Sequence, residues 1–202
     1  MTKAIVKLRS RLNGSVKIEL KAEKPFEKIK VVIQKDGKAV FSNDYAILPT
    51  DFFVGDFRVE NPLIWSLSDP ELYEYQIEIA YADGEKEMVF GRFGFREIGE
   101  NGKNITINGK PVYIRGYIRG AKAHDHANLL GLPLKDFYLK NLRQAKKFGF
   151  NYVRFHSVVP EEELFEAADE VGMLVHVELR PPHDIYNNLE EMVTTGNAIV
   201  PE

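Results

Sequence analysis

Three apolar strand patterns alternate with two amphipathic helical patterns in the second half of this 202-residue chain. The strand patterns lie at residues 111–116, 150–155 and 173–179, and the helical patterns lie at 134–148 and 160–171. Strands and helices that alternate at this spacing predict parallel strand pairing with right-handed crossovers. About 20 residues follow the third strand. We therefore expect the first three β/α units of a truncated (β/α)8 TIM barrel, without the strands that would close it.

The first half of the chain has a different period. Apolar residues alternate with polar ones in segments around residues 16–20, 29–33 and 75–79, which is typical of half-buried antiparallel strands. Asparagine or aspartate followed by glycine, a strong turn signal, occurs at residues 13–14, 36–37 and 83–84. About seven short strands with turns at this spacing predict an immunoglobulin-like β-sandwich.

The pattern changes around residues 98–110, where glycines and asparagines are frequent. We place the domain boundary near Glu97, so that residues 1–97 form the sandwich and residues 98–202 the incomplete barrel. Residues 105–111 are expected to form a short hairpin. In the barrel part, Gly149 and Gly172 are expected to end the two helices, and Pro160 to lie in the first turn of the second one.

Composition excludes several classes of function. Hydrophobic residues make up 44% and charged residues 28% of the chain, and the net charge is −3, so nucleic acid and anionic membranes are not expected partners. The chain has no cysteine, which excludes disulfides and thiolate metal sites. No phosphate-binding glycine loop is present, and we expect no cofactor. The first residues lack a signal-peptide core, which leaves the localisation open and favours the cytoplasm if Met1 is the native start.

Polar residues are expected at the carboxyl ends of the second and third parallel strands. Residues two apart in a strand share a face, so Arg154 shares one with His156, and His176 shares one with Glu178. The apolar alternates should pack on the helices, which leaves the polar faces looking into the barrel, where active sites of such folds form. A structural ion pair between Arg154 and Glu178 is the competing interpretation. His156 is either a ligand contact or a buried structural imidazole, and His176 is expected to be a core histidine.

The first strand and its following loop offer weaker candidates. Arg115, Tyr117 and Arg119 should share a face, with Arg115 structural and Arg119 either structural or in contact with a ligand. His124, Asp125 and His126 suggest a metal, but adjacent residues of a loop do not all face one ion without a special turn, so we expect none. The same holds for residues 183–184.

Several segments together carry a resemblance to a known family. Residues 61–73 read Asn-Pro-Leu-Ile-Trp-Ser-Leu-Ser-Asp-Pro-Glu-Leu-Tyr, and residues 93–96 read Phe-Gly-Phe-Arg. Further matching stretches are 107–116, 149–154 and 169–175, followed by Glu178. In this order they resemble glycoside hydrolase family 2, which includes β-galactosidases, β-glucuronidases and β-mannosidases.

The resemblance implies retaining hydrolysis of terminal β-linked sugars by two carboxylates about 5 Å apart. In that family the two glutamates follow the fourth and seventh barrel strands, so no catalytic residue is expected here and the chain alone should be inactive. The resemblance implies that Arg154 orients the nucleophilic glutamate and that Glu178 lines the sugar pocket. We therefore name Arg154, His156, Glu178 and Arg119 as substrate-binding candidates.

This sequence also departs from the family pattern. Gly120 stands where the family has a histidine, and residues 156–160 and 177–180 differ from the usual runs after the second and third strands. These departures leave the preferred sugar open.

Two further hypotheses remain open. The chain could be a non-catalytic carbohydrate-binding or interaction module, which would need Trp65, its only tryptophan, as an exposed platform. Open barrel edges also predict a homo-oligomer or other self-association, or disorder after about Pro181.

Overall fold

A computed structural model describes residues 4–120, 123–156 and 158–178. Contacts between residues divide the chain into two compact units, Met1–Val112 and Tyr113–Glu202. The expectations for residues 183–184 and for the chain beyond Pro181 lie outside the described residues.

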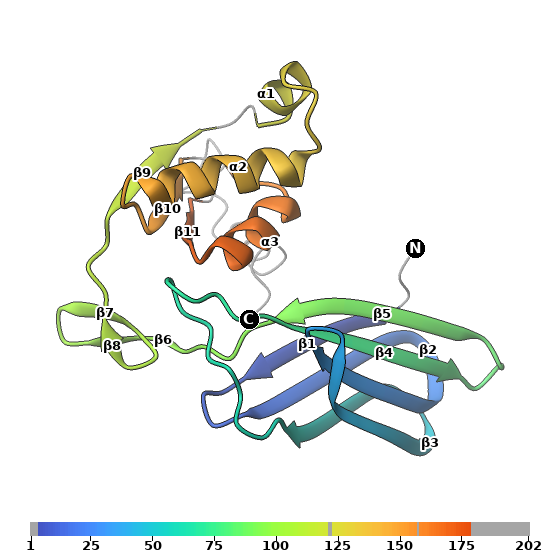
Figure 1. Ribbon diagram of the computed structural model, residues 1–202. Helices are drawn as coiled ribbons and strands as arrows, with labels where there is room; N and C mark the ends of the chain where they lie inside the picture. The colour runs from blue at the N-terminus through green and yellow to red at the C-terminus, as the bar shows by residue number, and fades with distance from the viewer. Residues whose placement is uncertain (1–3, 121–122, 157, 179–202) are drawn as a thin grey trace, which may run out of the picture. The chain divides into compact units, whose positions relative to one another are not determined.

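The first unit is built from antiparallel strands (Figure 1). Its main strands are β1 (Ala4–Ser10), β2 (Ser15–Lys35), β3 (Lys38–Arg58), β4 (Tyr73–Tyr81) and β5 (Lys86–Phe93). They pair in the order β1-β2-β4-β5, with β3 also paired to β2. A separate small sheet joins β6 (Ile98–Asn101), β7 (Asn104–Ile107) and β8 (Lys110–Pro111). The described part of residues 1–97 thus has five strands where about seven were expected.

Two long strands explain the lower number. Both β2 and β3 have 21 residues, and their pairing is interrupted by register shifts around Phe26. Before the irregularity the even-numbered residues Val16, Ile18 and Leu20 are buried, and after it the odd-numbered residues Ile29 to Ile33 are. The first part of β2 pairs with β1 and the second part with β4, and side chains from both parts join one core. One long strand with an irregularity therefore takes the place of two expected short strands, and the β content is sandwich-like.

The turn signals are confirmed. Asp36 and Gly37, which join β2 to β3, have φ angles of 51° and 75°. Asn108 and Gly109, between β7 and β8, have φ angles of 53° and 74°, which confirms the short hairpin expected there. Positive φ at both central residues is the conformation that two-residue hairpins require, and asparagine, aspartate and glycine adopt it most readily.

The second unit confirms the alternating parallel pattern. Its strands are β9 (Gly116–Arg119), β10 (Tyr152–Phe155) and β11 (Leu174–Val177), all parallel and arranged in the order β11-β10-β9. Its helices are α1 (Ala123–Leu129), α2 (Leu134–Lys147) and α3 (Glu162–Val171). The residues from His124 to His126 therefore belong to a helix and not to a loop, which corrects the expectation.

The first parallel strand begins five residues later than expected. Residues 111–116 have a strand-like sequence because the apolar residues Val112 and Ile114 lie two positions apart. In the structure, however, Pro111 pairs with Thr106 in the small sheet. The backbone between Pro111 and Gly116 is hydrogen-bonded to the buried side chain of Asn151. Asn151 Nδ2 donates to the Tyr113 carbonyl at 2.9 Å, and Asn151 Oδ1 accepts from the Arg115 backbone N–H at 2.8 Å. Regular pairing with β10 starts only at Gly116.

The helix ends agree with the sequence at their carboxyl termini. Gly172, with φ 73° in the left-handed region, ends α3, and Gly149 follows the last turn of α2. At the other end of α3 the capping position is Glu161, so Pro160 precedes the helix and is not part of its first turn.

One face of the parallel sheet is covered by helices α2 and α3. Val153 and Phe155 of β10 lie in the same core as Leu142 of α2 and Leu164 of α3. The two helices are also joined at the surface, where the Lys135 ammonium lies 2.8 Å from carboxylates of Glu166 and Glu170. The core fixes which strand residues face the helices and, by alternation, which face away.

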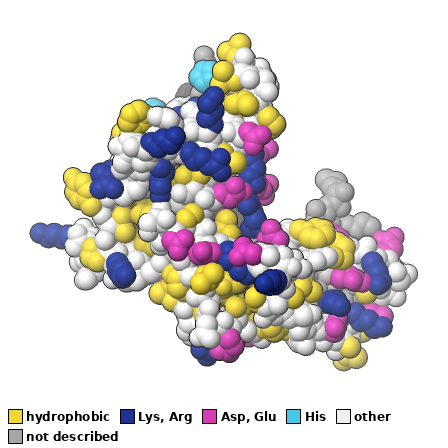
Figure 2. All heavy atoms as spheres, in the orientation of Figure 1, with side chains coloured by type: hydrophobic (Ala, Val, Ile, Leu, Met, Phe, Trp, Pro, Cys, Tyr) yellow, Lys and Arg dark blue, Asp and Glu magenta, His cyan; other side chains and the backbone are white. Residues whose placement is uncertain are grey.

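Acidic and basic side chains are interspersed over the face of the molecule seen in Figure 2. Within the described residues, no helix is both long and apolar enough to cross a membrane.

Candidate functional site

The candidate site lies on the face of the parallel sheet that is turned away from the helices. In the strand register, Arg154 pairs with Ile118 on one side and with His176 on the other. Its neighbours Val153 and Phe155 are buried against the helices, so Arg154 points to the opposite face. Ile118 on this face is 65% exposed. The described elements of the second unit therefore leave the polar face of this sheet open.

Two of the predicted residues form an ion pair at the carboxyl end of the sheet. The Arg154 Nη2 atom lies 2.8 Å from Glu178 Oε2, and the two side chains are 34% and 32% exposed. The Glu178 amide donates to the Phe155 carbonyl at 3.1 Å, which continues the ladder one residue beyond β11 and fixes where its side chain emerges.

His156 joins this pair. Its Nε2 atom lies 3.9 Å from Glu178 Oε2, and its side chain is 60% exposed. The His156 amide donates to the Arg119 carbonyl at 2.8 Å, which holds the backbone in line with β9. Arg154, His156 and Glu178 are thus brought together as the sequence predicted, at the edge where parallel strands usually present functional groups.

The three side chains are suited to binding a polar ligand. A guanidinium supplies several donors in a fixed plane, a carboxylate accepts, and an imidazole does either. An ion pair that is one third exposed adds little stability, so a polar ligand that competed for its charges would cost the fold little. Glu178 is the one carboxylate on this face among the described residues, whereas retaining hydrolysis needs two.

A tyrosine and a histidine extend the polar face, and sequence reasoning missed their contact. The Tyr152 hydroxyl lies 2.5 Å from His176 Nδ1. His176 is exposed, which corrects the expectation of a core histidine, since no described element of the second unit covers this face. Burial raises the pKa of Tyr152, and nearby Arg154 acts in the opposite direction. This contact could have been predicted from the sequence, because Tyr152 lies two residues before Arg154 and both side chains therefore lie on the same face of the strand.

The Tyr152 ring lies over the backbone of β9. A Cβ atom added to Gly116 would lie 2.5 Å from Tyr152 Cδ1, so this position requires glycine for the ring to sit where it does. The polar face is thus shaped by a glycine in the neighbouring strand.

Arg119 does not lie beside Arg154, His156 and Glu178. It pairs in register with Phe155, which places it on the helix side, and its Nη1 atom donates to Asn141 Oδ1 of α2 at 3.1 Å. Its guanidinium lies 5.3 Å from the centre of the Phe137 ring. Tyr117 shares this face, as expected, and burial raises its pKa. Arg115, expected to be structural, donates through Nε to the Gly149 carbonyl at 2.6 Å.

A partly buried hydrogen bond lies on the helix side of the same sheet. The Tyr138 hydroxyl of α2 donates to the carboxylate of Glu161, the residue that precedes α3. Burial raises the pKa of Tyr138, and the Glu161 carboxylate raises it further. This bond joins α2 to the segment that follows His156 in the chain.

Trp65 is fully buried and so offers no exposed platform for a sugar. The Arg96 guanidinium lies 4.6 Å from its ring centre, and Gly94 packs against its Cβ atom. Its carbonyl accepts from the Asn108 side chain at 2.9 Å. In the described part of the chain, no three metal-ligating side chains gather at one point.

Comparison with known proteins identifies the class. Residues 2–96 match the model of glycosyl hydrolases family 2. The β-galactosidase of Kluyveromyces lactis is 31% identical over 153 residues, which is 70% of this chain and 14% of that protein.

Solved structures of β-glucuronidases share the fold. β-Glucuronidase 3 of Bacteroides uniformis superimposes with a TM-score of 0.71 at 20% identity, covering 97% of this chain and 26% of that one. The Parabacteroides merdae enzyme gives 0.69 at 23% identity, covering 88% and 23%. Antiparallel and parallel units in this order are thus found in glycoside hydrolases. These matches support membership of the chain in glycosyl hydrolases family 2, and the chain spans about one seventh of the K. lactis relative.

Proposed function

We propose that this chain provides one wall of the sugar-binding site of a retaining glycoside hydrolase that acts on terminal β-linked sugars. The observation that carries this proposal is the cluster of Arg154, His156 and Glu178 at the carboxyl end of three parallel strands. Family membership supplies the reaction class. The names of the relatives point to β-galactosides or β-glucuronides as substrates.

In this proposal each clustered residue has its own role. Arg154 donates to the nucleophilic carboxylate or to a sugar hydroxyl, Glu178 accepts from sugar hydroxyls, and exposed His156 contacts the sugar from the rim. Arg119 acts indirectly, because its side chain is held by Asn141 on the other face while its carbonyl anchors the His156 backbone.

The architecture we propose has two parts. Residues 1–97 form an immunoglobulin-like sandwich, and residues 98–202 form the first three β/α units of a TIM barrel. The end of the family match at residue 96 supports a boundary near Glu97, although the contacts also group the small sheet of residues 98–111 with the first unit.

The 202-residue chain alone is expected not to hydrolyse glycosides. Glu178 is the one carboxylate on the polar face of the described sheet, and an acid and a nucleophile are both needed. The edges of β9 and β11 pair with no other described strand, which supports self-association of the isolated chain.

Calorimetric titration of the chain with galactose and with glucuronate tests the binding role. We expect dissociation constants on the order of millimolar for at least one sugar, since one wall of a site makes few contacts. Arg154→Lys should abolish the heat of binding, because lysine lacks the planar donors of arginine. Arg143→Lys, an exposed change on α2, should leave it unchanged.

Equal binding by wild type and Arg154→Lys would overturn the assigned role of Arg154. The absence of binding to either sugar by the wild type would overturn the proposed site. Hydrolysis of nitrophenyl β-glycosides by the purified chain would contradict the expected inactivity.

A further inference from the structure

The outer face of the antiparallel sheet carries an ordered arrangement of charge. In the strand register Lys30 of β2 lies directly between Asp44 of β3 and Glu78 of β4. One row further along the strands, Ala46, Lys28 and Ala80 are the corresponding neighbours, and Ala80 pairs with Lys86 of β5. The Lys86 side chain reaches back to Glu78, with Nζ and Oε1 2.6 Å apart. Acidic and basic positions therefore alternate from strand to strand.

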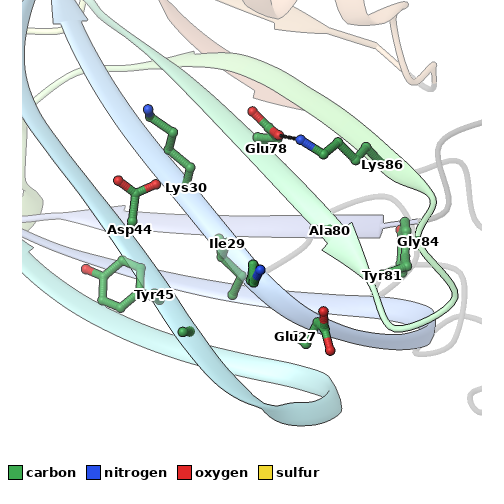
Figure 3. Close-up of a pocket in the computed structure, with 12 residues that line it drawn as sticks. Glu27, Ile29, Lys30, Asp44, Tyr45, Glu78, Ala80, Tyr81, Gly84 and Lys86 are labelled. Atoms are coloured by element: carbon green, nitrogen blue, oxygen red, sulfur yellow. Dashed lines mark hydrogen bonds and ion pairs between the residues drawn. The ribbon is translucent and has the colours of Figure 1, made fainter.

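Figure 3 shows this face, with Lys30 between Asp44 and Glu78 and with the Glu78–Lys86 pair beside them. The residues line a hollow of about 540 Å³ whose alanines, Ala46 and Ala80, leave room above the sheet. Both neighbouring lysines lower the pKa of Glu78, Lys86 more strongly than Lys30, which keeps its carboxylate charged. At the β5 edge of the same face the Phe90 side chain is 66% exposed.

We propose that this face is a self-complementary interface through which two copies of the chain dock around a two-fold axis parallel to the strands. Such an axis places β2 of one copy over β4 of the other, and β3 over β5. Lys30 then faces Glu78 of the second copy, and this contact occurs twice, as an isologous interface requires.

The same arrangement also places long side chains opposite small ones. In the alanine row, Lys28 faces Ala80 of the second copy, and Lys86 faces Ala46 of the second copy. Long side chains thus enter the space that alanines leave, and the Lys86 ammonium comes within reach of Asp44 of the second copy. Packing of two sheets face to face at about 10 Å leaves room for one layer of side chains from each.

The size of the face sets the strength of the contact. Four strands about 4.8 Å apart and four rows about 6.8 Å apart give roughly 500 Å² per copy. Contacts of this size are weak and reversible, so the dimer should form in a concentration-dependent way. Because charges dominate it, the contact should weaken as salt is added.

Sedimentation of the full chain with charge-swapped variants tests the proposal. Lys30→Glu alone and Glu78→Lys alone should each weaken association about tenfold or more, since each turns two attractive contacts into repulsive ones. An equimolar mixture of the two variants should associate again as a heterodimer, because every Glu then faces a Lys. Lys21→Glu, an exposed change on the outer face formed by β1 and the first part of β2, should have no effect.

The mixing result separates this face from other routes of self-association. Association through the open edges of the parallel sheet would be unaffected by either single variant. The expected result is loss in both single variants and recovery in the mixture, at an ionic strength of about 0.01 M and not at about 1 M. A monomeric wild type, unchanged association in the single variants, or no recovery in the mixture would each overturn the proposal.

Discussion

The antiparallel sheet of the first unit and the parallel sheet of the second distribute their charges differently. On β2 and β4, charges of opposite sign alternate across an exposed face whose opposite side is a continuous apolar core. On β10 and its neighbours, a shorter sheet packs one face on two helices and gathers an arginine, two histidines and a glutamate at one end of the other face. Alternating charge of this kind can complement a second copy of the same face, whereas charge gathered next to an exposed Ile118 suits a polar ligand.

The largest effect should come from the core of the first unit. Trp65→Ala removes a fully buried ring that Arg96 and Gly94 contact, so we expect a loss of about 3–5 kcal/mol in the free energy of unfolding. Denaturant unfolding followed by near-ultraviolet circular dichroism measures it. A change below about 1 kcal/mol would mean that Trp65 is not a core residue.

The second unit should respond separately to Leu142→Ala. Leu142 is buried where α2 meets the sheet, and its truncation should cost about 2–5 kcal/mol. Helical circular dichroism reports this unit, because the described helices all lie in it. Loss of the helical signal in Trp65→Ala at the same denaturant concentration as in Leu142→Ala would contradict the division into two units.

A substitution of Asn151 tests whether its side chain holds the backbone that precedes β9. Asn151→Ala leaves the Arg115 amide and the Tyr113 carbonyl without their partner, which should cost about 1–3 kcal/mol. Asn43→Ala, at an exposed position of β3, is the matched control and should change stability little. Chemical denaturation of both variants gives the comparison, and equal effects would remove Asn151 from its assigned role.

The buried tyrosines predict a matched alkaline response in the two units. Tyr138 bonds to Glu161 and Tyr81 to Glu87, and burial and the carboxylate both raise the pKa of each hydroxyl. Unfolded tyrosine ionises near pH 10, so the stability from the raised pKa is complete below about pH 10 and is lost as pH rises further. Tyr138→Phe should flatten this decline for the second unit and Tyr81→Phe for the first. Denaturation midpoints measured as pH rises above about 10 give the slopes.

A tyrosine variant that declines like the wild type would contradict this assignment.

The smallest effect on stability should come from the candidate site. The Arg154–Glu178 pair is one third exposed, so Arg154→Ala and Glu178→Gln should each change the free energy of unfolding by at most about 1 kcal/mol. Thermal or chemical unfolding checks this. A loss of several kcal/mol would favour the structural ion pair that the sequence left open.

Local signals predicted much of the fold. Asp36-Gly37 and Asn108-Gly109 specified their turns through positive φ, and Gly172 specified the end of α3. Alternation predicted which residues of β10 face the helices. These features depend on a few neighbouring residues, which is why one sequence was sufficient.

Other features depend on tertiary contacts and were missed. The start of β9 is set by Asn151, which is 35 residues beyond Gly116 in the chain and bonds the backbone before it. The continuity of β2 depends on partners that pair with it on both sides of the irregularity at Phe26.

The candidate site was predicted only in part, because some of its positions follow from local alternation and others depend on tertiary contacts. Arg154, His156 and Glu178 are close because adjacent parallel strands are in register, which alternation predicts once the sheet is assumed. The face on which Arg119 lies depends on the start of β9, and the sequence misplaced that start. The predicted sharing of a face by Tyr117 and Arg119 was correct, but this face is the one that packs on α2.

Mapping of sugar contacts by nuclear magnetic resonance tests the central claim most directly. During titration with galactose or glucuronate, shift changes should cluster at Tyr152, Arg154, His156, His176 and Glu178, with none on the sandwich strands. Changes confined to the antiparallel sheet, or no change at any residue of the polar face, would contradict the assignment of this face as the sugar-binding wall.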